Sequence, residues 1–248
     1  MNQNIKTPAR IAALSFVGAL ALASQAHAGV SLVGNASQNP DGSIQLTNAA
    51  GQAGAAWFAT PLSTSQSFSE TFSFVLAANG SYPMADGISF ALQNQGTNVV
   101  GGGGGDVGFS GLGAVGSVVQ TWYNNTVGLN TDGYAYDTTG NPNEFMGGNA
   151  QVTGTETVAY DASTQTLSLN ALVDGYSFSQ QANVDLASIY GASVYAGFTG
   201  GTGGAGSVQT ITSFSPLTAV PEPGSIALML AGLGLVGTAA RRRTQQAR

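Results

Sequence analysis

Three kinds of residue in the middle of this 248-residue chain could hold a ligand: an acidic side chain, a run of glycines and a tryptophan. The carboxylate of Asp86 can accept hydrogen bonds from two hydroxyl groups, and its charge strengthens both bonds. Gly103, Gly104 and Gly105 let backbone N–H groups approach a ligand closely, because no Cβ intervenes. The face of Trp122 could cover the apolar side of a ring. These residue types together suit a neutral ligand that is rich in hydroxyl groups.

The stretch from Gly29 to Ala219 contains no basic side chain. All six lysines and arginines and the single histidine, His27, lie outside it, while eleven of the twelve acidic residues lie within it. Nucleic-acid binding is excluded because nothing in this stretch can neutralise phosphates. An anionic polysaccharide is disfavoured by charge repulsion. Catalysis by a Ser–His pair, a lysine base or a cysteine thiolate is also excluded, since those groups are absent.

The same composition limits how the acidic residues can be stabilised. No carboxylate between Gly29 and Ala219 can form a salt bridge within that stretch. A buried one therefore needs hydroxyls, backbone N–H groups, water or a metal cation. Without histidine or cysteine in the stretch, a zinc or iron site built on those ligands is excluded. Ca²⁺ is the metal that suits an all-oxygen environment best.

Several short segments alternate apolar and polar residues, as half-buried strands do. The clearest are 68–76 and 88–93, and the others are 117–123, 155–160, 166–172, 193–198 and 208–214. Turn-forming sequences such as Asp174-Gly175 separate them, and only 183–190 suggests a short helical turn. This pattern predicts an all-β domain, an antiparallel β-sandwich. The chain has no cysteine, so no disulfide can stabilise the domain. A domain of about 190 residues can nevertheless bury a sizeable hydrophobic core.

Both ends of the chain are typical of targeting segments. Lys6 and Arg10 precede an apolar stretch, and Ala26-His27-Ala28 is a small-x-small cleavage site, so residues 1–28 are predicted to be a signal peptide that ends at Ala28. At the other end, two prolines, which cannot continue a strand ladder, end the domain; residues 29–219 therefore form the predicted domain.

Residues 220–248 form the predicted tail. Pro221-Glu222-Pro223 is followed by an uncharged, mainly apolar run over 226–240 and then by Arg241–Arg243. This run of 15 residues is shorter than the roughly 20 that cross a bilayer as a helix. The tail resembles the PEP-CTERM sorting signal of Gram-negative bacteria; the alternative is an ordinary single-span anchor.

The resemblance implies processing at the inner membrane. An exosortase-type membrane enzyme is expected to cut near Pro221, Glu222 and Pro223, and the arginines are expected to stay in the cytoplasm until then. The protein would be exported and released to the cell surface or extracellular matrix. We expect an N-terminal signal helix and a C-terminal hydrophobic sorting helix in addition to the sandwich.

The succession of motifs from Val30 to Phe214 resembles the legume-type (L-type) lectins, which have a concanavalin-A-like sandwich, a jelly roll. The resemblance rests on Phe72-Ser73-Phe74, on Ala85-Asp86-Gly87 at the start of a strand, on the glycine run 101–105 and on the segment 197–203. In that family the Asp of Ala-Asp-Gly follows a cis peptide bond and binds sugar hydroxyls, while the glycine loop supplies a backbone N–H.

The resemblance therefore implies a carbohydrate-binding site in this chain. Asp86 would accept hydrogen bonds from the sugar, and an amide among Gly103, Gly104 and Gly105 would donate one. Trp122 and Asn125 are further candidate contacts.

One strand departs from the family pattern. Where the family carries Glu-x-Asp, whose carboxylates bind a transition metal and Ca²⁺, this chain has Gln120 and Trp122, and the metal-binding histidine is missing. No transition metal is therefore expected. A Ca²⁺ site could survive in the oxygen-rich loop from 124 to 144, with Asn124 or Asn125 and Asp132 as ligands. The alternative is a solvated surface loop.

Two other function classes are alternatives to a lectin. Glucanases share this sandwich, but they need clustered carboxylates, about 5 Å apart in retaining enzymes. Glu70, Glu144 and Glu156 are isolated in the sequence and no Glu-x-Asp-x-x-Glu string occurs, so an enzyme is not expected. The other class is a structural matrix or biofilm protein that binds no sugar. We expect an exported lectin-like protein that binds a neutral or cationic carbohydrate, such as an exopolysaccharide.

Overall fold

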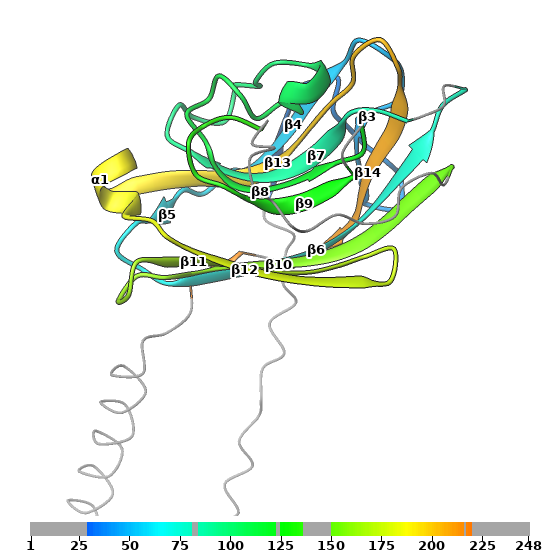
Figure 1. The fold of residues 1–248 in the computed structure, drawn as a ribbon. Helices are drawn as coiled ribbons and strands as arrows, with labels where there is room; N and C mark the ends of the chain where they lie inside the picture. The colour runs from blue at the N-terminus through cyan, green and yellow to red at the C-terminus, as the bar shows by residue number, and fades with distance from the viewer. Residues whose placement is uncertain (1–28, 81–83, 123–124, 136–149, 216, 220–248) are drawn as a thin grey trace, which may run out of the picture.

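Two antiparallel β-sheets face each other and form a sandwich (Figure 1). The computed structural model describes residues 29–80, 84–122, 125–135, 150–215 and 217–219. The predicted antiparallel β-sandwich is confirmed. Within the described ranges, no helix is both long enough and apolar enough to cross a membrane. The predicted signal and sorting helices lie outside these ranges, together with Ala28, Pro221, Glu222 and Pro223.

The upper sheet in Figure 1 has seven strands in the spatial order β1-β4-β13-β7-β8-β9, and β5 pairs with β13. Their bounds are β1 Val30–Gly34, β4 Ala53–Phe58, β5 Leu62–Ser63, β7 Gly87–Gln93, β8 Val115–Gln120, β9 Thr126–Asn130 and β13 Ser193–Gly201.

The lower sheet has eight strands in the order β12-β11-β10-β6-β14-β3-β2, and β15 pairs with β6. Their bounds are β2 Ser37–Gln38, β3 Ile44–Thr47, β6 Phe68–Ala78, β10 Gln151–Asp161, β11 Thr166–Val173, β12 Tyr176–Asn183, β14 Ser207–Phe214 and β15 Thr218–Ala219.

The main core lies between the sheets and follows the predicted alternation on β6. Phe68, Glu70, Phe72, Phe74 and Leu76 are buried there, while the residues that alternate with them are half-buried or exposed. The ring of Phe72 lies 5.0 Å, centroid to centroid, from that of Phe198 on β13. Aromatic contacts of this kind add about 0.5–1.5 kcal/mol each beyond the burial of their surface. The inner faces of the sheets are therefore held together by apolar packing.

A second hydrophobic cluster covers the outer face of the seven-stranded sheet. The loop that follows the glycine run inserts Val107 and Phe109 against Trp57, and all three side chains are fully buried. The indole Nε1 of Trp57 donates to the backbone oxygen of Val99 at 2.8 Å. Because this loop covers the sheet, every residue of β7 is buried. The strand predicted at 88–93 is therefore confirmed, but it is fully buried and not half-buried as predicted.

The helical turn predicted within 183–190 is the short helix α1, Leu186–Tyr190. The carboxylate of Asp185 accepts a hydrogen bond from the N–H of Ser188 at 3.0 Å and so caps the helix. The strand predicted over 117–123 ends earlier, at Gln120. Trp122 therefore lies in the loop after β8.

Candidate functional site

Three segments meet at one end of the seven-stranded sheet: the residues just before β7, the loop after β13, and the glycine loop with its short 3₁₀ turn, η1 (Gly104–Asp106). The N–H of Asp86 donates to the backbone oxygen of Gly201 at 3.0 Å. The N–H of Gly104 donates to the backbone oxygen of Thr202 at 3.0 Å. Strand ends that are far apart in the sequence are thus joined beside Asp86.

Asp86 follows a cis peptide bond, Ala85–Asp86. The backbone oxygen of Ala85 accepts a hydrogen bond from the Ser207 hydroxyl at 2.8 Å. The backbone oxygen of Asp86 accepts one from the N–H of Thr121 at 2.8 Å. The cis bond expected from the lectin resemblance is present, and the carbonyl groups of Ala85 and Asp86 accept hydrogen bonds from β14 and from the residue after β8.

The Asp86 carboxylate is buried, and only part of its hydrogen-bonding capacity is used. The side chain is 6% exposed, and Oδ2 has no hydrogen-bond partner among the described residues. Burial raises the pKa of this carboxyl group, and a hydrogen bond from the backbone of Gly203 opposes part of that rise. A Cβ built at Gly203 would lie 3.2 Å from Oδ2, and one at Gly104 would lie 4.0 Å away. Oδ2 is therefore an acceptor flanked by two glycines, so no side chain of theirs fills the space beside it.

The three glycines predicted to bind the ligand have different roles in the structure. Gly104 has a φ of 62°, a left-handed conformation that favours glycine, and its N–H is already used by Thr202. The backbone oxygen of Gly105 accepts a hydrogen bond from the Gln120 side chain. Gly103 is exposed. A ligand at this loop would therefore have to find its backbone donor at a residue other than Gly104.

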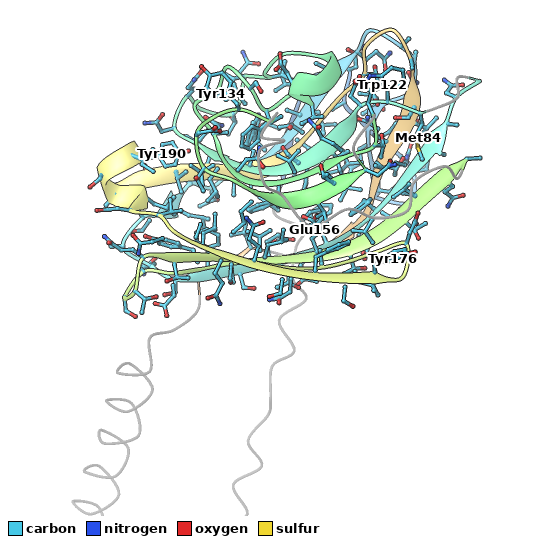
Figure 2. The ribbon with its side chains drawn as sticks, viewed as in Figure 1. Met84, Trp122, Tyr134, Glu156, Tyr176 and Tyr190 are labelled. Atoms are coloured by element: carbon cyan, nitrogen blue, oxygen red, sulfur yellow. The ribbon has the colours of Figure 1, made fainter. Side chains whose placement is uncertain are left out.

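Trp122 and Asn125 flank a short segment outside the described ranges. Trp122 is half-buried and follows Thr121, whose N–H contacts Asp86, so it lies at the same end of the sheet (Figure 2). Asn125 is half-buried with a φ of 42°. Their contact with a sugar remains a prediction.

The segment 197–203 carries part of the lectin resemblance, but the sequence prediction gave no site role to Thr202 or Gly203, in the loop after β13. Besides Gly203, the site uses Thr202, whose hydroxyl donates to the backbone oxygen of Ala49 at 2.7 Å and accepts from the N–H of Gln52 at 2.9 Å. Thr202 thereby ties the end of β13 to the loop before β4. A signal was available, because the glycine-rich segment 200–204 directly follows a strand, as the run 101–105 follows β7 and its turn.

The described residues do not fit a cation at the family's metal position. Gln120 has an amide donor where the family has a carboxylate, and that amide donates to the backbone oxygens of Gly105 and Ala135. Asp132 is exposed, and its Oδ1 accepts from the N–H of Tyr134 at 3.0 Å. In the part of the chain that the structure describes, no three His, Cys, Asp or Glu side chains gather as metal ligands. Asn124 lies outside that part, so Ca²⁺ at Asn124 and Asp132 remains a prediction.

Two other carboxylates lie deep between the sheets. Glu70 on β6 pairs with Val158, and Glu156 on β10 pairs with Phe72, so the two glutamates are diagonal neighbours on the inner face. They are 0% and 1% exposed, and Figure 2 shows Glu156 between the sheets. Burial raises the pKa of Glu70 to about 8 and that of Glu156 to about 7. Although they are isolated in the sequence, the fold brings them together, but in the hydrophobic core.

Surface grooves occur on the outer face of the eight-stranded sheet, away from Asp86. One is lined by residues of β6, β10 and β14 and by the turn after β11. A second lies over β11 and β12. Their lining residues include Ser73, Thr155, Asn170, Leu172 and Ser177. These grooves are the main alternative to the Asp86 end as a place where a ligand could bind.

Comparison with known protein families finds two matches. The legume lectin domain matches residues 15–119, and the PEP-CTERM protein-sorting motif matches residues 219–243. The first match begins within the predicted signal peptide, 1–28. Both resemblances predicted from the sequence are therefore confirmed as matches: one part of the chain is similar to the legume lectin domain, and the tail matches the PEP-CTERM sorting motif.

Solved lectin structures have the same fold. Peanut lectin, solved with a nine-residue peptide, is 27% identical with a TM-score of 0.67, and the match covers 80% of this chain and 95% of that one. The Bauhinia forficata lectin in complex with GalNAc is 23% identical with a TM-score of 0.65, covering 80% and 96% of the two chains. Lectin UEA-II complexed with galactose is 22% identical with a TM-score of 0.64, covering 75% and 91%. The sandwich of this chain is thus a legume lectin fold over most of the length of those lectins.

Proposed function

We propose that this chain is an exported lectin-like protein that binds a neutral carbohydrate where Asp86 lies. The observation that carries the proposal is the Asp86 carboxylate oxygen Oδ2, which has no hydrogen-bond donor among the described residues and lies between Gly104 and Gly203. A sugar hydroxyl would supply the missing donor in a charge-assisted hydrogen bond. Because Asp86 is 6% exposed, binding would require the loops around it to open.

The charge of the domain narrows the ligand class. Eleven carboxylates and no basic side chain lie between Gly29 and Ala219, so an anionic polysaccharide would be repelled. Two of the similar lectin structures contain GalNAc or galactose, which are uncharged. These two sugars are therefore suitable first probes, and a neutral exopolysaccharide is the corresponding polymeric partner.

The match to the sorting motif supports an activity outside the cell. In this proposal residues 1–28 direct export, residues 29–219 form the lectin-like domain, and the tail 220–248 holds the protein at the inner membrane. An exosortase-type enzyme then cuts near Pro221, Glu222 and Pro223, and the domain reaches the cell surface or matrix.

The last described residue, Ala219, and the proposed site lie at opposite ends of β6. Ala219, at the end of the described chain, pairs with Phe68, the first residue of β6. At the other end of the strand, Ala78 pairs with Ser207, whose hydroxyl reaches the backbone oxygen of Ala85. The 11 residues of β6 span roughly 35 Å. While the tail still anchors the protein, it would therefore not block access to the end of the domain where Asp86 lies.

An enzymatic role is not part of this proposal. The only carboxylates that the described fold places on adjacent inner strand positions, Glu70 and Glu156, are closed off from solvent by the sandwich core. A polysaccharide could not reach them without unfolding the domain.

A glycan array tests the proposal. The wild-type protein is expected to bind neutral glycans, and Asp86→Ala is expected to lose that binding. Asp161→Ala is the matched control, because Asp161 follows Tyr160, which pairs with Phe68 at the far end of β6. Loss of binding in both variants, or in neither, would argue against a site at Asp86.

The second candidate is a structural matrix protein that binds no sugar. The low exposure of Asp86 and the grooves on the outer face of the eight-stranded sheet favour it. It predicts an empty glycan array together with self-association that depends on outer-face residues such as Leu172, which is 50% exposed. Analytical ultracentrifugation of wild type and Leu172→Ser would measure that association.

A further inference from the structure

The side chain of Gln120 joins two loops beside the proposed site. Its Nε2 donates to the backbone oxygen of Gly105 at 3.0 Å and to that of Ala135 at 3.2 Å. Gly105 belongs to the glycine loop, and Ala135 belongs to the segment after β9. The side chain is 4% exposed, so both bonds are shielded from water.

The chemistry of this contact sets the orientation of the amide. Two carbonyl oxygens converge on one atom of Gln120, and carbonyl oxygens only accept hydrogen bonds. An amide turned the other way would place a third oxygen against them. The position therefore requires a donor or a cation.

Gln120 also lies directly beside Asp86. In the register of β7 and β8 it pairs with Gly87, the residue after Asp86. The next residue, Thr121, donates its N–H to the backbone oxygen of Asp86. A Cβ at Gly87 would lie 2.0 Å from the backbone oxygen of Val119, so the two strands approach as closely as a glycine allows. One residue thus connects the strand of Asp86 with the loop of Gly104 and Gly105.

We propose that the Gln120 amide takes the place of a bound cation and holds the glycine loop against Asp86, so that the site works without a divalent metal. Gln120 is a positioning residue in this account. The inference rests on the proposed function, because it concerns the same carbohydrate site.

Gln120→Glu is the informative substitution. It replaces the donor with a carboxylate and gathers three oxygen ligands, the kind of environment that Ca²⁺ prefers. Wild-type binding of galactose or GalNAc is expected to be equal in EDTA and in millimolar Ca²⁺. Binding by Gln120→Glu is expected to fall at least about tenfold in EDTA and to return with Ca²⁺. Its Tm is expected to rise by about 3 °C with Ca²⁺, since a cation that binds only the folded state stabilises it.

Two controls separate this effect from general damage. Gln120→Ala removes the donor without adding a ligand, so its binding is expected to fall without recovery in Ca²⁺. Gln93→Glu makes the same chemical change at the opposite end of β7, where the Gln93 amide donates to the backbone oxygen of Gly96 at 2.7 Å. No response of its Tm or sugar binding to Ca²⁺ is expected.

Each outcome decides the inference. Wild-type binding that is lost in EDTA and restored by Ca²⁺ overturns it, as does a Gln120→Glu variant that binds sugar normally without Ca²⁺. If the wild type binds no sugar in either condition, the proposed function fails, and the Ca²⁺ dependence of the Tm of Gln120→Glu still tests the role of Gln120. If Gln120→Glu does not fold, the wild-type comparison decides: insensitivity to EDTA supports the inference and sensitivity overturns it.

Discussion

Asp86 and Glu70 are both buried carboxylates with an oxygen that lacks a donor among the described residues, yet they lie in opposite surroundings. Asp86 lies at the end of the seven-stranded sheet, with its Oδ2 between Gly104 and Gly203. Glu70 lies among phenylalanines on the inner face of β6. An unsatisfied acceptor at a glycine-lined strand end can be completed by a ligand. In the core, hydrogen bonds from Ser215 offset only part of the burial cost of Glu70, and protonation removes the charge.

The comparison predicts that removing the Asp86 charge weakens sugar binding without lowering the stability of the fold. Asp86→Asn is expected to weaken sugar binding about 10–100-fold, the value of one or two charge-assisted hydrogen bonds. Its Tm at neutral pH is not expected to fall, because burial disfavours the charged form. Calorimetric titration and thermal melts check both. A variant that binds normally would remove Asp86 from the site.

The two adjacent glycines after Thr202 offer a matched pair of substitutions. A methyl group at Gly203 would lie 3.2 Å from Oδ2 of Asp86, whereas one at Gly204 would meet no atom within 4 Å. Gly203→Ala is therefore expected to weaken binding about fivefold, roughly 1 kcal/mol, and Gly204→Ala is expected to change it little. Equal effects in the two variants would place the sugar away from Oδ2.

Glu70 is expected to govern stability and not binding. Its pKa is raised from 4.5 to about 8 in the folded chain, chiefly by burial. A raised carboxyl pKa contributes stability that is fully present below the unfolded value and is lost as the pH rises through the folded value. The wild-type Tm should therefore fall as the pH rises from about 5 to about 9. At about pH 9, the Tm of Glu70→Gln should be roughly 5 °C above that of the wild type. Sugar binding that changes with this substitution would contradict the separation of the two regions.

Glu156 is expected to give a smaller effect of the same sign. Its Oε2 accepts a hydrogen bond from the Ser117 hydroxyl at 2.5 Å, which offsets part of the burial cost, and its pKa is about 7. The stability that its protonation contributes should be lost as the pH rises from 4.5 through about 7. Glu156→Gln is expected to raise the Tm by about 2 °C above that range. Ser117→Ala should lower the Tm most where Glu156 is charged.

A strand could be predicted from the sequence when one of its faces is exposed to solvent and the other is buried, because its residues then alternate between polar and apolar. The alternation on β6 is plain because its outer residues contact solvent. Strand β4 was missed because both of its faces are buried and its sequence, Ala-Gly-Ala-Ala-Trp-Phe, does not alternate. Strand β12 was missed for the opposite reason, since most of its residues are polar and none is buried.

Some residues of the candidate site could also be predicted from the sequence, and others could not. Asp86 and the glycine loop could be proposed from short motifs that resemble a family. The contacts of Gly203 and Gln120 could not, because they depend on which strands become neighbours: Gly203 reaches Asp86 from the loop after β13, and Gln120 reaches Gly105 from the end of β8. The diagonal placement of Glu70 and Glu156 likewise depends on the register of β6 and β10.

The most direct measurement is a crystal structure of the protein with galactose or GalNAc. The account predicts a sugar hydroxyl at about 2.7 Å from Oδ2 of Asp86, with the loops of Gly104 and Gly203 parted to admit it. A sugar bound instead in the grooves on the outer face of the eight-stranded sheet, with Asp86 still covered, would contradict the account.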